Sequence, residues 1–213
     1  MTVWVKICGI TRIEDARAAL EAGADAIGIN FWPRSRRYCP PSRAREIVMA
    51  LPAEFLVYGV FVDTPRTQIE AIVAEAGLTG VQLHGSEDMH AALHWSLPVI
   101  RAVGAASHAV AAAALQAASD AGSAEAAARG RYRVLLDNPA GGGSGRVIDP
   151  ELLAGLDLSR AIVAGGLTPE NVSDIVARFA PFGVDTAGGV EAAAGIKDPR
   201  LIEEFIAHAR SAR

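Results

Sequence analysis

The sequence predicts a single-domain (β/α)8 TIM barrel of the α/β class, spanning residues 1–213. Three observations lead to this prediction. Short strand-type runs alternate with longer helix-type runs along the whole chain, which is the pattern of a parallel α/β fold. Eight such pairs fit the 213 residues at about 27 residues per pair, enough for one short β/α unit. No linker-like segment divides the chain into two parts.

The expected strands are short apolar runs. Several are almost continuously apolar rather than alternating, which is typical of strands that helices cover on both faces. They are Val3–Cys8, Ala26–Phe31, Leu56–Val62, Gly80–His84, Pro98–Val103, Tyr132–Asp137, Ala161–Gly166 and Gly183–Gly188.

The expected helices lie between these strands, and five of them begin at a proline, which suits the first turn of a helix. Ser42 and Thr64 stand beside two of those prolines as helix-start residues. The shortest segment, Pro150–Leu153, makes the weakest helix. The full set is Thr11–Ala22, Pro41–Leu51, Pro65–Ala76, Ser86–His94, Ser107–Ala121, Pro150–Leu153, Pro169–Phe179 and Pro199–Arg210.

An open doubly wound sheet is the alternative architecture. It needs fewer strands and usually carries a GxGxxG turn after the first strand, where this chain has Gly9-Ile10-Thr11. Two further segments are biased in composition. The alanine-rich stretch Ala105–Arg129 is expected to form a surface helix and a loose connection, and Gly141–Gly145 an active-site lid.

Composition excludes several classes of function. The net charge of −4 does not favour nucleic acid or an anionic membrane as a partner. We expect no signal peptide and no membrane-spanning helix, and hence a cytoplasmic protein. Cys8 and Cys39 match no zinc spacing, and the five histidines do not cluster, so we expect no metal. Composition leaves both a monomer and a homodimer open.

Active sites of β/α barrels lie at the carboxyl ends of the strands. Cys8 and Asp137 end the first and sixth strands and are the candidate pair for acid/base catalysis. Each also has a structural interpretation, since cysteine is often a small buried residue and aspartate often caps a turn.

The other candidates would bind substrate. Gly165-Gly166 and Gly188-Gly189 follow the seventh and eighth strands. They could be simple tight turns, but two pairs at adjacent strand ends favour a phosphate site made of backbone N–H groups. Arg37, or its neighbours Arg34 and Arg36, could bind a carboxylate. His84 could hydrogen-bond substrate, and Asp185 could orient a site group or be a buried structural acid.

These motifs, in order, closely resemble the phosphoribosylanthranilate isomerase family of tryptophan biosynthesis. The resemblance covers nearly the whole chain. Its most specific parts are KICGIT at residues 6–11 and QLHG at residues 82–85, followed by AGGLTPENV at 164–172 and GVE at 189–191.

The resemblance implies a cofactor-free Amadori rearrangement, by general acid/base catalysis, of N-(5-phosphoribosyl)anthranilate to 1-(2-carboxyphenylamino)-1-deoxyribulose 5-phosphate. The residue matching Asp137 would protonate the furanose ring oxygen. The residue matching Cys8 would then remove the C2′ proton from the resulting Schiff base. The residue matching Arg37 would hold the anthranilate carboxylate.

The chain departs from the family in two places. The loop after the eighth strand usually reads DVSSGVE, but here it reads DTAGGVE, so Ala187 and Gly188 replace two serines. Loss of hydroxyl contacts to phosphate would cost about 1.5–3 kcal/mol and raise KM. In addition, VIDP at residues 147–150 stands where Phe-Asp-Trp is common, which concerns the anchoring of the lid.

Two alternative functions follow from these residues. The aminoaldose isomerase of the histidine pathway has an aspartate where this chain has Cys8 and needs a second phosphate site, which argues against it. A non-catalytic phosphosugar-binding barrel is suggested by Ala187-Gly188, but the intact pair Cys8 and Asp137 argues for turnover.

Overall fold

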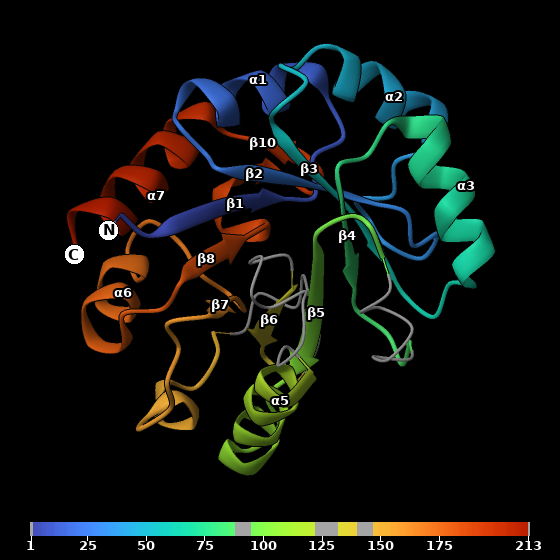
Figure 1. The fold of residues 1–213 in the computed structure, drawn as a ribbon. Coiled ribbons are helices and arrows are strands. Elements are labelled where there is room, and N and C mark those ends of the chain that lie inside the picture. Colours follow the sequence, from blue (N-terminus) through green and yellow to red (C-terminus); the bar gives the residue numbers. More distant parts are fainter. Residues whose placement is uncertain (1, 88–94, 122–131, 140–146, 213) are drawn as a thin grey trace.

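The computed structural model describes residues 2–87, 95–121, 132–139 and 147–212. Eight parallel strands form a closed barrel in chain order, and β8 pairs with β1 to complete it (Figure 1). The predicted (β/α)8 barrel is therefore confirmed. The strands are β1 Trp4–Cys8, β2 Ala26–Asn30, β3 Leu56–Phe61, β4 Gly80–Leu83, β5 Val99–Gly104, β6 Tyr132–Asp137, β7 Ala161–Val163 and β8 Gly183–Thr186.

Each strand lies where the sequence predicted it, with small differences at the ends. The largest is in β7, which was expected to reach Gly166 but ends at Val163. Gly165 and Gly166 both have positive φ, +89° and +67°, a left-handed conformation that cannot continue a strand.

Six α-helices surround the barrel in the described part of the chain (Figure 1). They are α1 Ile13–Glu21, α2 Pro41–Met49, α3 Arg66–Ala76, α5 His108–Ala121, α6 Val172–Phe179 and α7 Pro199–Ser211. Most of the helix expected at 86–94, the end of the alanine-rich stretch and the expected lid at 141–145 lie outside the described residues. None of the described helices is long and apolar enough to cross a membrane.

Two expectations about helices differ from the structure, and two elements were not expected. Pro150–Leu153 is a single 3-10 turn, η1. The Asp149 carboxylate accepts a hydrogen bond from the Glu151 N–H at its start. Neither Ser42 nor Thr64 caps a helix: α2 begins directly after Pro40 and α3 directly after Pro65. A further 3-10 turn, η2 (Gly188–Val190), and a small hairpin of β9 (Glu191–Ala193) and β10 (Ile196–Lys197) follow β8 and were not expected.

Strand side chains alternate between two apolar layers. Outward-facing residues such as Val5 and Ile7 pack under the helices in the main core. The inner layer is smaller and fills one end of the barrel, where Trp4 stacks on Phe182 with ring centroids 5.9 Å apart. Towards the carboxyl ends of the strands the buried inner side chains become polar: Lys6, Gln82, Asp137 and Asp185. The barrel therefore carries its buried polar groups at the end where the site was predicted.

Candidate active site

Cys8 is the last residue of β1, and its side chain points into the barrel. Strand alternation puts it on the same face as Lys6, while Ile7 between them packs in the outer core. A β-carbon on Gly28, the partner of Cys8 on β2, would lie 2.8 Å from Cys8 Sγ and 3.2 Å from Lys6 Nζ. Glycine at position 28 therefore makes the room in which the thiol and the ammonium group meet.

Burial raises the pKa of the Cys8 thiol above its ordinary value. The charge of Lys6 opposes this shift, Asp185 adds to it, and Lys197 opposes it more weakly. Cys8 is consequently a thiol at neutral pH in the unliganded site. Its conversion to a thiolate, the form that accepts a proton, depends on the cations beside it.

Asp137 ends β6, and its buried carboxylate is held on both oxygens. Oδ1 accepts hydrogen bonds from the backbone N–H of Asn138 at 2.8 Å and from its Nδ2 at 3.3 Å. Oδ2 lies 3.4 Å from Nε2 of His84. The Gln82 amide lies 3.3 Å from Nδ1 of the same imidazole. With this amide as donor, the imidazole carries its proton on Nε2, the atom that faces Asp137.

Asp185 lies on the inner face of β8 and pairs with Lys6 across the joint between the first and last strands. Asp185 Oδ1 accepts a hydrogen bond from Lys6 Nζ at 2.6 Å, and both side chains are buried. Burial raises the pKa of Asp185, an effect that the Lys6 charge opposes. Burial lowers the pKa of Lys6, but Asp185 and Cys8 outweigh it, so the net pKa is raised. Sequence analysis left two interpretations of Asp185, a residue that orients a site group and a buried structural acid. The ion pair with Lys6 favours the first.

A cavity of about 300 Å³ opens at the ends of β6, β7 and β8. Its walls include Asp137, Asp185 and all four glycines of the predicted phosphate site: Gly165, Gly166, Gly188 and Gly189. A β-carbon on Gly189 would lie 1.9 Å from the carbonyl oxygen of Leu167. Thr186 Oγ1 donates a hydrogen bond to that same oxygen at 2.7 Å. The loops after β7 and β8 are therefore fitted to each other around the cavity.

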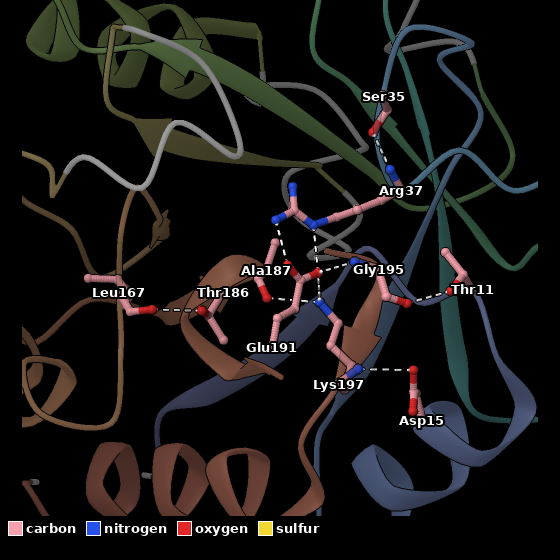
Figure 2. A network of polar contacts seen from close by, with 10 residues as sticks. All are labelled: Thr11, Asp15, Ser35, Arg37, Leu167, Thr186, Ala187, Glu191, Gly195 and Lys197. Atoms are coloured by element: carbon pink, nitrogen blue, oxygen red, sulfur yellow. Dashed lines mark hydrogen bonds and ion pairs between the residues drawn. The ribbon is translucent and has the colours of Figure 1, made fainter. Parts of the chain in front are cut away.

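Arg37 follows β2, and its side chain packs against Gly9. Its guanidinium group reaches Glu191, the first residue of β9 (Figure 2). Its Nε and Nη2 donate to the two carboxylate oxygens of Glu191 at 2.6 and 2.7 Å. Glu191 also accepts from Lys197 Nζ at 2.9 Å, and Lys197 Nζ donates to the carbonyl of Ala187 at 2.8 Å. Burial raises the pKa of Glu191, but the hydrogen bonds and charges of Arg37 and Lys197 outweigh it, so the net pKa is lowered. This network fixes Arg37 through Nε and Nη2, and Nη1 takes no part in the ion pair with Glu191.

The structure brings most of the predicted residues together. Asp137, Asp185 and the four glycines share one cavity, and His84 contacts Asp137. Cys8 and Arg37 are not among the described residues that line this cavity. Their backbones lie at the end of β1 and in the segment after β2. Arg34 and Arg36 are exposed, whereas Arg37 is ordered by Glu191. The structure therefore favours Arg37 among the three arginines.

Five polar residues of this site had no role assigned from the sequence: Lys6, Gln82, Asn138, Glu191 and Lys197. Lys6 could have been found from strand alternation, because it lies two residues before Cys8. Glu191 and Lys197 depend on the hairpin after β8, which is too short to leave a periodic signal. Cys39, the other cysteine, is buried away from the site, where burial raises its pKa to about 11. Among the described residues, no group of three or more His, Cys, Asp and Glu side chains could hold a metal ion.

Comparison with known proteins adds an independent finding. A family model described as N-(5'phosphoribosyl)anthranilate (PRA) isomerase matches residues 5–208. The N-(5'-phosphoribosyl)anthranilate isomerase of Myxococcus xanthus is 41% identical over 215 residues, which cover 99% of this chain and 98% of that protein. The crystal structure of phosphoribosyl anthranilate isomerase from Thermotoga maritima matches with a TM-score of 0.85 and 37% identity, covering 98% of this chain and 99% of that one. A structure of such an enzyme in complex with reduced 1-(o-carboxyphenylamino)-1-deoxyribulose 5-phosphate matches with a TM-score of 0.79 and 35% identity, covering 98% and 99%.

Proposed function

The chain belongs to the N-(5′-phosphoribosyl)anthranilate isomerase family of tryptophan biosynthesis, and from this premise we propose how its side chains carry out the reaction. The substrate, N-(5′-phosphoribosyl)anthranilate, is an aminoaldose that undergoes an Amadori rearrangement to 1-(2-carboxyphenylamino)-1-deoxyribulose 5-phosphate. The reaction needs one proton delivered to the sugar and another removed from it. The observation that carries the proposal is that Cys8 and Asp137, two groups able to exchange protons, end β1 and β6 at the same mouth of the barrel.

Asp137 acts first, as the general acid. Its protonated carboxyl group donates to the furanose ring oxygen, and the bond from that oxygen to C1′ breaks. The lone pair of the anthranilate nitrogen then forms the C=N bond of a protonated Schiff base. His84 is the neighbour that orients the Asp137 carboxyl group, since its Nε2 lies 3.4 Å from Oδ2.

Cys8 acts second, as the general base. Its thiolate takes the proton from C2′, and the C–H electron pair becomes the C1′–C2′ double bond while the C=N pair returns to nitrogen. The resulting enolamine tautomerises to the ketone product. Each of these positioned proton transfers contributes roughly 10²–10⁴-fold in rate.

Two parts of the mouth would bind the two charged groups of the substrate. The cavity at β6, β7 and β8 is lined by Gly165, Gly166, Gly188 and Gly189, whose backbone can approach a phosphate closely. Arg37 lies beside this cavity, since its Nη2 would be 3.2 Å from a β-carbon on Gly188, and the remainder of its planar fork would bind the anthranilate carboxylate. A related enzyme has been crystallised with a reduced form of the same phosphorylated product, which supports this assignment.

The experiment that tests the mechanism is turnover of N-(5′-phosphoribosyl)anthranilate by the Asp137→Asn variant. We expect kcat to fall by roughly 10³-fold or more, because an amide cannot donate the proton with comparable acidity. Asp157→Asn is a matched control, since that exposed carboxylate stands before β7, at the end of the barrel away from the mouth, and accepts from the Ser159 N–H. Undiminished turnover in Asp137→Asn would overturn the mechanism, and substrate binding without turnover in the unmodified chain would favour the non-catalytic alternative.

A further inference from the structure

The chain contains only two lysines, Lys6 and Lys197, against eighteen arginines. Every other cationic side chain of the sequence, histidine apart, is therefore an arginine. The two lysines are also unusual in their position, because Lys6 is 0% and Lys197 is 3% exposed. Lysine is rarely buried to this extent without a specific partner, so the placement of both lysines calls for an explanation.

The Lys6 ammonium group lies beside Cys8, and the charge of Lys197 also acts on the thiol. Lys6 Nζ and Cys8 Sγ converge on the space above Gly28, where a single β-carbon would be 3.2 Å from the nitrogen and 2.8 Å from the sulfur. Lys197 lies on β10, and its Nζ is fixed by Glu191 and the Ala187 carbonyl. An arginine is the usual residue for a buried ion pair that needs a planar fork, whereas lysine supplies a compact point charge.

We propose that Lys6 is a positioning residue that stabilises the thiolate of Cys8, and that Lys197 supports it from the side of the hairpin. The proposal rests on the role of Cys8 as base in the proposed function. In that role the sulfur must be negative before it takes the C2′ proton and neutral afterwards. A fixed cation beside the sulfur favours the thiolate that starts this step and remains protonated throughout it.

Asp185 completes the arrangement. Its carboxylate binds Lys6 Nζ at 2.6 Å, which fixes the ammonium group under the sulfur and keeps it charged in spite of burial. The same carboxylate repels a thiolate, so Asp185 orients Lys6 while it opposes part of the effect of Lys6. The charge of Lys6 lowers the Cys8 pKa and that of Asp185 raises it, and the effect of Lys6 is the larger of the two.

Four charged groups face Cys8, and their signs decide the direction of the effect. Lys6 on β1, Lys197 on β10 and Arg37 after β2 are cations, and Asp185 on β8 is the anion. Burial still leaves the pKa of Cys8 above its ordinary value. The cations therefore limit the rise in the Cys8 pKa that burial causes. Removal of Lys6 should raise this pKa further.

The test measures the apparent pKa of Cys8 without substrate, from the rate of alkylation by iodoacetamide as a function of pH. A Cys39→Ser background leaves Cys8 as the only thiol. Lys6→Met should raise the apparent pKa by about one unit or more, the usual effect of removing an adjacent opposite charge. Lys197→Met makes the same change of size and charge as Lys6→Met, and it should raise the apparent pKa of Cys8 by a smaller amount. An unchanged pKa in Lys6→Met would overturn the proposal.

A second variant separates electrostatics from misfolding. Lys6→Met/Asp185→Asn removes the buried pair without leaving an unpaired charge, and its fold can be checked by circular dichroism. Because Lys6 acts on Cys8 more strongly than Asp185 does, the apparent pKa should remain above that of the parent. A return to the parent value would mean that Lys6 acts only as a structural partner of Asp185, which contradicts the proposal.

The low number of lysines permits a third measurement that needs no Lys6 variant. A chain labelled with ¹³Cε-lysine should give two side-chain signals in an NMR titration. The Lys6 signal should shift at the pH at which Cys8 becomes reactive, and this step should disappear in Cys8→Ser. A Lys6 signal that is flat across the Cys8 titration would overturn the proposal. None of these readouts needs turnover, so loss of activity in Asp137→Asn and the state of the Cys8 thiol are judged separately.

Discussion

Gly165 shows how closely a single residue can be tied to the chemistry of the site. Its φ of +89° favours glycine. A β-carbon there would also lie 2.9 Å from Asp137 Oδ1 and 2.8 Å from the backbone nitrogen of Asn138. The hydrogen bond that orients the proposed acid therefore occupies the space that a larger residue would need.

We predict that Gly165→Ala lowers kcat by roughly 10²-fold, the cost of displacing a catalytic group by about 1 Å. Gly155→Ala is the matched control, because Gly155 has a similar φ of +75° but nothing within 4 Å of the added carbon. Both variants should lose about 1–3 kcal/mol of unfolding free energy through backbone strain. Equal kinetics in the two variants would show that Gly165 matters only for the backbone.

The departure at Ala187 and Gly188 gives a second prediction at this scale. Ala187→Ser should lower KM by about tenfold if a hydroxyl at that position reaches the phosphate, since a hydrogen bond to a charged group contributes about 1.5–3 kcal/mol. Gly188→Ser is constrained differently, because its β-carbon would lie 3.2 Å from Arg37 Nη2. Comparison with Gly188→Ala isolates the hydroxyl, and steady-state kinetics of the three variants gives the result. If KM is the same in Ala187→Ser as in the parent, the hydroxyl has no role there.

At the residue scale, the sequence predicts groups that end a strand better than groups that pair across the barrel. Cys8 and Asp137 could be located because they follow apolar runs. The pairing of Lys6 with Asp185 joins residues 179 positions apart and depends on the register between β1 and β8. Strand alternation places Lys6 on the inner face, but it does not identify the residue opposite.

At the scale of elements, the hairpin of β9 and β10 connects the loop after β8 to the loop after β2. Glu191 on β9 accepts hydrogen bonds from the side chains of Arg37 and Lys197. The N–H of Gly195, in the turn of the hairpin, donates to the same carboxylate at 3.2 Å. The sequence predicts the long elements well, because apolar periodicity persists over a strand or a helix. It misses this hairpin, whose strands have three and two residues and little apolar surface.

We predict that Glu191→Gln raises KM by about tenfold, or about 1.4 kcal/mol, because Arg37 loses the charged partner that fixes its fork. The pH dependence of stability should change as well. The pKa of Glu191 is lowered in the folded chain, so its contribution is present above the unfolded pKa of about 4.3 and is lost as pH falls through the folded pKa. Urea unfolding at pH 7 and pH 4 should therefore differ less in the variant than in the parent. Glu70→Gln, in an exposed pair with Arg66, should leave both KM and this difference unchanged.

At the scale of the whole molecule, the barrel closes where the first strand meets the last, and the pair Lys6–Asp185 spans that joint. Its side chains are 0% and 9% exposed, so each charge depends on the other for compensation. The apolar inner layer lies at the other end of the barrel, around Trp4 and Phe182. The end that carries the site is thus held together by ionic and hydrogen-bonded contacts rather than by apolar packing.

This division of the barrel predicts an asymmetry in stability. Asp185→Ala leaves the Lys6 ammonium group buried without its partner, and should lower the unfolding free energy by about 3–5 kcal/mol. The double variant Lys6→Met/Asp185→Leu replaces the pair with apolar side chains of similar volume, and should unfold at nearly the urea concentration of the parent. Glu46→Ala, which breaks an exposed pair with Arg43, is the control and should change stability by less than about 1 kcal/mol. A double variant as unstable as Asp185→Ala would mean that the ion pair itself is needed to close the barrel. A stable double variant with a raised Cys8 pKa would instead mean that the pair is kept for the chemistry at the mouth, because the fold does not require it.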